Sequence, residues 1–281
     1  MDVLQTKESL AKELTQLKGQ GRTIGFVPTM GALHRGHLSL VDCSRRQDDV
    51  TVVSIFVNPT QFNRRDDFEQ YPRNLTSDLK DLEEAGVQVV FIPGEAEMYP
   101  EPDHRTFDFG QLDKVMEGHY RPGHFDGVAK IVSKLFDAVQ PHRAYFGEKD
   151  FQQLVIIRDL TRQMDYDIEI IGCPIVREPN GLAISSRNKR LSAEQRKQAA
   201  QLSRVIFQAR QYADRYAIDQ LKAWVVAELN KNSEMDVEYF EVVDEATLTS
   251  VNAWSDAYYK RACVAAWVGQ VRLIDNVKFY F

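Results

Sequence analysis

Residues 23–47 read TIGFVPTMGALHRGHLSLVDCSRRQ, and this stretch decides the fold of the chain. A β-rich run from Thr23 to Val27 is followed by a segment that contains Gly31 and Gly36, and then by a helical pattern. The two glycines let the backbone come close to a ligand. Because the start of a helix presents unpaired N–H groups and the positive end of its dipole, the turn between strand and helix is suited to an anion.

The same order of elements continues along the chain. The run from Val50 to Val57 is continuously apolar, as in a strand buried on both faces. We expect further strands at residues 87–92, 144–146 and 168–173, and helices around residues 10–17, 37–47, 75–86, 128–139 and 151–164. Strands that alternate with helices predict an α/β fold with a Rossmann-like, doubly wound parallel sheet, in which ligands lie beyond the carboxyl ends of the strands.

The pattern changes near Val176. Two helical stretches, residues 192–212 and 218–231, precede strand-like runs at residues 237–243, 262–268 and 271–274. Helices grouped before strands predict a smaller C-terminal α+β domain with an antiparallel sheet. We therefore expect a first domain of residues 1–175 and a second of residues 176–281.

The composition is that of an ordinary globular protein, with 281 residues and a net charge of −6. A mildly acidic surface argues against general binding to nucleic acid but allows a small anionic substrate in a locally basic site. The N-terminal segment does not resemble a signal peptide, and no run of about 18 apolar residues predicts a membrane span. The odd set Cys43, Cys173 and Cys263 forms no CxxC pair, which favours a reducing, cytoplasmic location.

His34 and His37 lie three residues apart at the start of the expected helix, where both imidazoles can donate hydrogen bonds to one phosphate. A lone HxxH carries little weight, because six histidines in this chain also produce incidental pairs in turns. A zinc site is a second alternative, but no third ligand stands at a usual spacing. The strand, glycines and helix around the pair favour the phosphate interpretation.

Polar side chains also follow two other expected strands. Asn58 and Gln61 come after the second strand and are expected to project into the cleft. Lys149 follows the fourth strand as a compact cation for phosphates, and Asp150 is expected to cap the next helix. Each segment alone is more simply a polar strand end or a solvated turn.

The segment at the domain boundary carries Ser185, Ser186 and Arg187. Two hydroxyls and a guanidinium in succession suit the β- and γ-phosphates of a nucleotide. An exposed Ser-Ser-Arg segment is usually a linker, so it indicates phosphate binding only in combination with the other motifs.

His34-Arg-Gly-His37 resembles the HxGH signature of the nucleotidylyltransferase and class I aminoacyl-tRNA synthetase superfamily, whose two histidines stabilise charge at the α-phosphate of a nucleotide. The longer string FVPTMGALHRGHLSL, residues 26–40, is more specific and resembles the pantothenate synthetases (pantoate–β-alanine ligases). Residues 54–62, 121–125, 146–153 and 176–188 are similar to segments of that family in the same order, and so is Arg272-Leu-Ile-Asp-Asn276.

This resemblance implies an AMP-forming acid–amino-acid ligase on the route to coenzyme A. Such an enzyme condenses (R)-pantoate with β-alanine to pantothenate through a pantoyl-adenylate, uses ATP and Mg²⁺, and releases AMP and pyrophosphate. The resemblance also implies that residues 1–175 bind ATP and pantoate, that residues 176–281 close over the site, and that the chain forms a homodimer. Its partners would then be small substrates, with neither nucleic acid nor membrane.

The resemblance assigns roles to individual residues. His34, His37 and Lys149 are the implied catalytic residues. Gln61, Gln153 and Asn58 are the implied substrate-binding residues, since an amide both donates and accepts. ATP contacts are implied for Met30, Gly31, Ala32, Leu33, His34, Arg35, Gly36, His37, Gly147, Glu148, Lys149, Asp150, Val176, Ile184, Ser185, Ser186 and Arg187.

Two positions depart from the family pattern. Asn180 stands where the family commonly has an aspartate. This difference should be tolerated if the residue only forms a turn, because Asn-Gly forms turns readily. Ser77-Asp78 stands where many members carry adjacent acids, so Asp78 alone is a weak candidate for a magnesium ligand. We do not expect His124, in the segment 121–125, to take a direct part in the reaction.

Other functions remain open at the level of sequence. Another HxGH nucleotidyltransferase would transfer a nucleotide to a phosphate and need no amine. A tRNA synthetase fits less well, because no basic anticodon-binding region is evident. A non-catalytic nucleotide-binding regulator would bind ATP without turnover, and the complete set of polar motifs argues against it.

Overall fold

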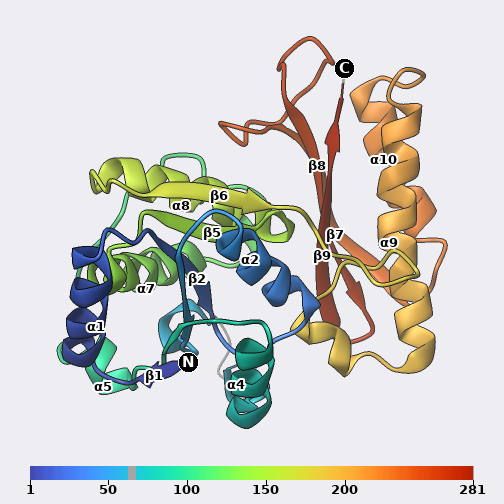
Figure 1. Ribbon diagram of the computed structural model, residues 1–281. Coiled ribbons are helices and arrows are strands. Elements are labelled where there is room, and N and C mark those ends of the chain that lie inside the picture. Colours follow the sequence, from blue (N-terminus) through green and yellow to red (C-terminus); the bar gives the residue numbers. More distant parts are fainter. Residues whose placement is uncertain (63–67, 281) are drawn as a thin grey trace.

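The computed structural model describes residues 1–62 and 68–280, and within them it contains two sheets (Figure 1). The larger sheet has six strands in the order β1-β4-β3-β2-β5-β6, and every neighbouring pair is parallel. Its strands are β1 (Asp2–Leu4), β2 (Ile24–Thr29), β3 (Val50–Ile55), β4 (Val89–Phe91), β5 (Arg143–Gly147) and β6 (Glu169–Cys173). The predicted doubly wound parallel sheet is confirmed.

Helices cover both faces of this sheet. They are α1 (Lys7–Gly19), α2 (Arg35–Arg45), α4 (Leu75–Glu84), α5 (Glu95–Met98), α6 (Met116–Tyr120), α7 (His124–Val139) and α8 (Phe151–Gln163), with single turns η1 (Pro59–Gln61) and η2 (Glu148–Asp150). On β2, Phe26 packs into the cluster that contains α1, α7 and α8, whereas Val27 packs into the cluster with α2 and α4. Alternate side chains of a strand point to opposite faces, so strands covered on both sides must be apolar throughout.

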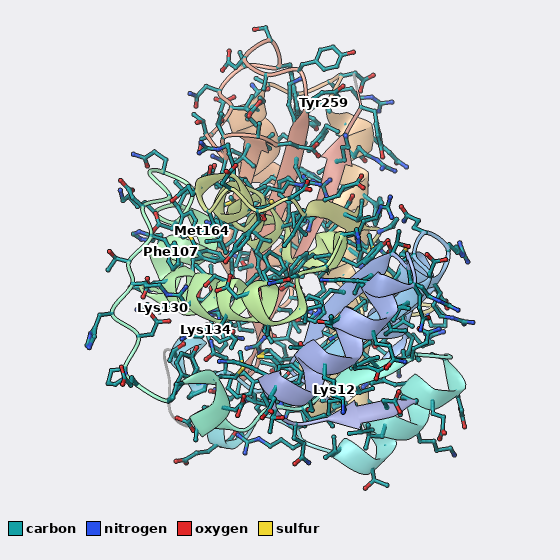
Figure 2. All side chains as sticks on the ribbon, turned by 60° about the vertical axis from the view of Figure 1, so that its left-hand side comes forward. Lys12, Phe107, Lys130, Lys134, Met164 and Tyr259 are labelled. Atoms are coloured by element: carbon teal, nitrogen blue, oxygen red, sulfur yellow. The ribbon has the colours of Figure 1, made fainter. Side chains whose placement is uncertain are left out.

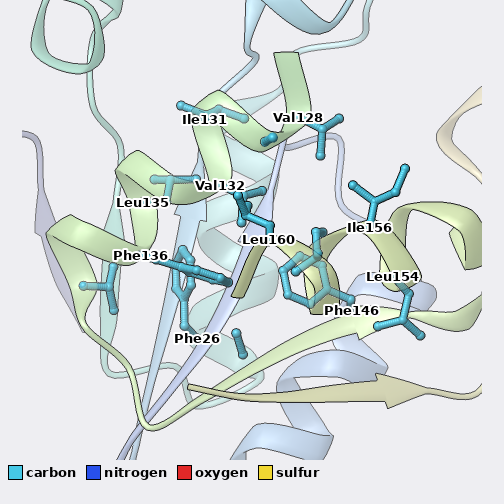
Figure 3. Close-up of a cluster of buried hydrophobic side chains, with 14 of the residues drawn as sticks. Phe26, Val128, Ile131, Val132, Leu135, Phe136, Phe146, Leu154, Ile156 and Leu160 are labelled. Carbon is cyan, nitrogen blue, oxygen red and sulfur yellow. The ribbon is translucent and has the colours of Figure 1, made fainter. Parts of the chain in front are cut away.

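Helix α7 shows how the sequence pattern becomes packing (Figure 3). Its buried apolar positions recur at helical spacing and include Val128, Ile131, Val132, Leu135, Phe136 and Val139. Phe136 packs edge-on against Phe26 and Phe146, with ring centroids 6.4 Å apart in both pairs. Burial of one such side chain contributes about 1.5–3 kcal/mol. The opposite face carries Lys130 and Lys134, which pair with Asp126 and Asp103 (Figure 2).

The smaller sheet is antiparallel and has the order β7-β8-β9. Its strands are β7 (Met235–Asp244), β8 (Lys260–Val268) and β9 (Val271–Phe279). Helices α9 (Ala193–Tyr212) and α10 (Ile218–Leu229) lie along one side of it, and a turn η3 (Ser186–Arg190) precedes them (Figure 1). Ser192 and Gln195 form a reciprocal capping box that starts α9 where the sequence predicted a helix.

The structure also differs from the sequence-based expectation at the N-terminus. Helix α1 is present, with Leu10 and Leu14 buried, but Asp2–Leu4 form an edge strand paired with β4. That strand was missed because three residues before a helix carry no period of their own. Among the described residues, no helix has the length and apolar character needed to cross a membrane.

Candidate active site

A cavity of about 230 Å³ lies at the carboxyl ends of β2, β5 and β6. Thr29 lines it at the end of β2 and Met30 directly after it, Gly147 at the end of β5, and residues 174–176 after β6. The carboxyl edge of a parallel sheet is where loops gather and ligands bind. The location predicted for the site is therefore where the structure has a cavity.

His34 is the N-cap of α2, and its ring lines this cavity together with that of His37. The Nδ1 atom of His34 accepts a hydrogen bond of 3.1 Å from the backbone N–H of Gly36. An accepting Nδ1 places the proton of the neutral ring on Nε2, which leaves Nε2–H as the donor for a ligand. The rings of His34 and His37 stack, with centroids 4.0 Å apart and planes inclined by 23°.

Both imidazoles are held in the neutral form. Burial, with the nearby charges of Lys149 and Lys189, lowers the pKa of His34 to about 4. Burial, the neighbouring His34 and the same two lysines lower the pKa of His37 to about 3. An arriving triphosphate would raise both pKa values, because an opposite charge favours the protonated ring. The site thus offers two uncharged donors inside a positive field.

The turn before His34 is braced from another helix. Gly31 and Ala32 have left-handed backbones, with φ of 78° and 51°. The carboxylate of Asp78, at the start of α4, accepts hydrogen bonds from the N–H of Ala32 at 2.9 Å and of Leu33 at 2.8 Å. A Cβ on residue 31 would lie 2.9 Å from Asp78 Oδ2, so glycine is needed there.

This brace bears on two sequence-based predictions, the ATP contacts of Ala32 and Leu33 and the magnesium contact of Asp78, which stay predictions. The backbone N–H groups of Ala32 and Leu33 face Asp78 and not the cavity, so they are not available to a phosphate. Asp78 is buried, and both of its carboxylate oxygens are already engaged by these backbone groups. Of the other implied ATP contacts, Gly31, Arg35 and Glu148 do not line the cavity either.

The described residues contain no group of three His, Cys, Asp or Glu side chains that could hold a metal ion. Mg²⁺ commonly keeps its waters and is held by one or two carboxylates together with substrate phosphates. Asp150, which lines the cavity and is half exposed, is a carboxylate of that kind. The donor set fits a magnesium ion that enters on the nucleotide, and it does not fit a resident metal centre.

Gln61 lines the cavity, whereas Asn58 lies behind it. The amide of Asn58 donates to the carbonyl of Gly127 at 3.0 Å, and its oxygen accepts from Tyr99 at 2.8 Å. The expectation that Asn58 projects into the cleft is therefore wrong, because its side chain ties η1 to α7. Direct contact of Asn58 with a substrate stays a prediction.

His124 supports the same turn. Its Nδ1 lies 2.8 Å from the carbonyl oxygen of Gln61, and burial, with the charge of Arg121, lowers its pKa to about 4. A Cβ on Gly127 would approach the Thr60 carbonyl to 2.4 Å, so α7 and η1 touch backbone to backbone. The position of Gln61 is thus set from α7.

Lys149 lies in the turn η2 and its side chain is 17% exposed. The positive charge of Lys149 acts on both imidazoles and helps to lower the pKa of each. Asp150 occupies the N-cap position of α8 but makes no capping hydrogen bond; its Oδ1 lies 3.6 Å from Lys149 Nζ. The prediction that Asp150 caps the helix is wrong, because φ and ψ of −94° and 60° are not the usual extended cap geometry.

The Ser-Ser-Arg segment forms the opposite wall of the cavity. Ser185 starts η3 and accepts from the N–H of Arg187, and all three residues line the cavity. Tyr71 lines the cavity together with Ser186, and its pKa is raised mainly by burial. The sequence interpretation missed Tyr71 as a residue that lines the cavity. Val176, Ile184 and Gln153, which the sequence also named, line the cavity as well.

A second, larger cavity of about 390 Å³ adjoins the first and shares Lys149, Asp150, Ser185 and Arg187 with it. It lies between the two sheets, with Glu117 and Arg121 on one side and Trp267 and Arg272 on the other. Arg272 donates to both oxygens of Glu117, at 2.8 and 2.7 Å. A buried ion pair therefore joins α6 to β9 across this space.

A doubly wound parallel sheet whose carboxyl edge carries paired neutral imidazoles, a lysine and a Ser-Ser-Arg wall defines an enzyme that acts on the phosphates of a nucleotide. Comparison with known proteins then narrows the class. The chain belongs to the pantoate-beta-alanine ligase family, whose model matches residues 2–278.

Similar proteins cover the whole chain. A pantothenate synthetase of Bacteroides thetaiotaomicron is 54% identical over 279 residues, which is 99% of both chains, and one of Porphyromonas gingivalis is 46% identical with the same coverage. The crystal structure of a pantothenate synthetase from Thermus thermophilus has a TM-score of 0.93, 42% identity and full coverage of both chains. A pantoate-beta-alanine ligase from Francisella tularensis, crystallised with beta-gamma ATP and beta-alanine, has a TM-score of 0.82, with 34% identity and coverage of 99% and 97%.

Proposed function

We propose that the chain condenses (R)-pantoate with β-alanine to pantothenate, using ATP and releasing AMP and pyrophosphate. The observation that carries this proposal is the stacked pair His34 and His37 at the mouth of the β2–α2 turn, facing a cavity that Lys149 also lines. Membership of the ligase family supports it, and so does the relative crystallised with beta-gamma ATP and beta-alanine.

The reaction needs two steps, because a carboxylate oxygen is a poor leaving group. In the first step the carboxylate oxygen of pantoate bonds to the α-phosphorus of ATP, and the bond to pyrophosphate breaks. In the second step the free amine of β-alanine attacks the acyl carbon, and AMP departs with the bridging oxygen. The proton lost by the amine is released to solvent, so atoms and charge balance.

His34 and His37 would donate to the α-phosphate as it becomes five-coordinate. Donors fixed in position stabilise developing charge without reorganising, and loss of one such donor typically lowers the rate by about 10²–10³-fold. Because both rings are neutral at the start, they act as hydrogen-bond donors and stabilisers of charge. No covalent intermediate with the protein is needed, since the substrate oxygen is the nucleophile.

The residues that would bind the triphosphate have a separate role. Lys149, Ser185, Ser186 and Arg187 would hold the triphosphate and then stabilise pyrophosphate as it leaves. A magnesium ion bound to ATP would neutralise charge on the phosphates, and Asp150, which lines the cavity, would be a carboxylate able to help hold it.

Gln61 and Gln153 would orient the hydroxy acid. Both line the cavity, and an amide can donate to the carboxylate while accepting from the adjacent hydroxyl. Holding the carboxylate near the α-phosphorus makes the attack effectively intramolecular. Gln61 is well suited to this because its backbone is fixed by His124.

The proposal extends to the organisation of the chain. Residues 1–175 would bind ATP and pantoate, residues 176–281 would close over them, and two copies would associate as a cytoplasmic homodimer. Tyr71 from the first part and Ser186 from the second line the same cavity, which supports closure. The family resemblance supports the dimer.

One assay tests the proposal. AMP formation is measured with ATP, pantoate and β-alanine, and then with each substrate omitted in turn. We expect turnover only with all three, and exchange of labelled pyrophosphate into ATP that requires pantoate but not β-alanine. AMP transfer to a phosphate acceptor without an amine, or ATP binding with no turnover, would overturn it.

A further inference from the structure

The C-terminal sheet contacts the catalytic turn through one buried amide. Asn276 lies on β9 and is 3% exposed. Its Nδ2 donates to the carbonyl of Glu148 at 2.8 Å and to the carbonyl of Lys149 at 3.0 Å. These two carbonyls belong to the turn η2, which carries Lys149. The side chain from the distant strand therefore holds two successive peptide groups of that turn.

The orientation of this amide is fixed from its other side. Arg261, on β8, donates to Asn276 Oδ1 at 2.7 Å. A guanidinium can only donate, so the amide oxygen must face it and the amide nitrogen must face the two carbonyls. Arg261 is itself held by Glu245 at 2.9 Å and stacks over Phe151 at 4.0 Å. Asn276 thus cannot rotate without breaking a buried network.

The direction of a side chain follows from its backbone. Fixing the carbonyls on both sides of the Lys149 Cα fixes the direction in which its side chain leaves the turn. Lys149 has few restraints of its own, because the partner of its Nζ within residues 1–62 and 68–280 is distant, Asp150 at 3.6 Å. A long, flexible ammonium stem is positioned mainly by where it starts.

We propose that Asn276 is a positioning residue that sets Lys149 for adenylate formation. This inference rests on the proposed function, and it gives the segment Arg272–Asn276 a role in the reaction that its place on a remote strand does not suggest. Asn276 touches no substrate and acts through the η2 backbone. The C-terminal sheet is then part of the catalytic apparatus as well as a cover.

The sharpest variant is Asn276→Asp. It keeps the size of the side chain and its contact with Arg261, but it turns an N–H donor into an oxygen that repels the carbonyls of Glu148 and Lys149. A displacement of the order of 1 Å lowers a rate by about 10²-fold, and this is the loss expected in kcat for pantoate-dependent pyrophosphate exchange. The KM for pantoate should stay close to that of the wild type, because Gln61 and Gln153 are untouched.

A double-mutant cycle with Lys149→Ala separates positioning from general structural damage. If Asn276 acts through Lys149, Asn276→Asp lowers exchange by less than about twofold in the Lys149→Ala background. Asn230→Asp is the matched control, since it makes the same change of side chain at the end of α10, where the oxygen that accepts from the N–H of Val237 is kept; it should keep wild-type exchange. Unfolding by urea checks that each variant is folded.

The outcomes are distinct. An Asn276→Asp loss that is undiminished in the Lys149→Ala background, or absent altogether, overturns the positioning role while leaving the proposed function intact. Equal losses in Asn230→Asp and Asn276→Asp also overturn it. Absence of pantoate-dependent exchange in the wild-type chain would instead overturn the proposed function.

Discussion

The imidazole rings of His34 and His37 stack with centroids 4.0 Å apart at the first turn of α2. Two rings this close cannot both be charged without strong repulsion, and burial opposes the charged form of each. The pair is therefore suited to a bound anion that accepts an N–H hydrogen bond from each ring. Substitutions at this site, and at the contacts that hold it, should have separable effects on rate, affinity and stability.

Replacing His37 by alanine should lower the rate of adenylate formation far more than the affinity for ATP. The expected loss in kcat is about 10²–10³-fold, because the donor acts chiefly on the charge that develops at the α-phosphate. Pyrophosphate exchange gives the rate, and calorimetric titration gives the affinity. His104→Ala, at an exposed histidine, is the control. Equal losses in rate and affinity would reduce His37 to a binding group.

The depressed pKa values of the two histidines predict a pH-dependent stability. Between the ordinary value of 6.5 and about 4 for His34, or about 3 for His37, the unfolded chain binds protons that the folded chain does not. The free energy of unfolding should therefore fall as the pH drops below about 6.5, by at most about 1.4 kcal/mol per pH unit for each proton.

Urea unfolding of the wild type and of the double variant His34→Gln/His37→Gln measures this effect. The comparison belongs between about pH 6.5 and 5.5, above the range in which carboxylates titrate. The double variant should show a shallower decline, with His124 responsible for part of what remains. Identical slopes in the two proteins would show that the rings titrate normally in the folded chain.

Asp78→Asn should destabilise the chain without changing its need for magnesium. The variant leaves one of two backbone N–H groups, on Ala32 or Leu33, without its acceptor, which costs about 1–3 kcal/mol. Urea unfolding measures the loss, and a magnesium titration of activity measures the metal requirement. Glu83→Gln, exposed on the same helix, serves as the control. A raised magnesium requirement with unchanged stability would restore Asp78 as a metal ligand.

Arg272→Met should be among the most destabilising substitutions between the two sheets. Burial would raise the pKa of Glu117, but the hydrogen bonds and charge of Arg272 hold it at about 2. Removing the arginine leaves a buried carboxylate without its main partner, at a cost of about 3–5 kcal/mol.

The loss from Arg272→Met should shrink as the pH falls towards about 4, because Glu117 can then take up a proton in the variant. Arg162→Met is the matched control: Arg162 is 74% exposed in its pair with Asp159, and such pairs contribute about 0–1 kcal/mol. Losses of the same size in the two variants would show that Glu117 is solvated.

The fold was predictable where its signals are local. The strand at β2, its glycines and the start of α2 follow one another within residues 23–47, and periodicity identifies the apolar face of α7. What could not be predicted depends on contacts between distant residues. Asp78 reaches Leu33 across 45 positions, and Asn58 reaches Gly127 across 69. The local sequence pattern does not show that a polar side chain will form its hydrogen bonds with a distant backbone group.

The short strand β1 illustrates a second limit. Asp2–Leu4 form a strand only because β4 offers a free edge. The prediction of this strand therefore requires knowing that β4 lies beside it. The role of Asn276 is of the same kind, since its amide meets Lys149 across 127 positions. Several residues named from motifs line the cavity, whereas the residues that hold them in place came only from the structure.

The central claim is that pantoate attacks the innermost phosphorus of ATP beside the paired imidazoles. Pantoate labelled with oxygen-18 in its carboxylate tests this most directly, with the products separated and analysed by mass spectrometry. We expect AMP to carry one labelled oxygen and pyrophosphate to carry none. Label in inorganic phosphate, with ADP as the other product, would show attack at the outermost phosphorus and contradict the claim.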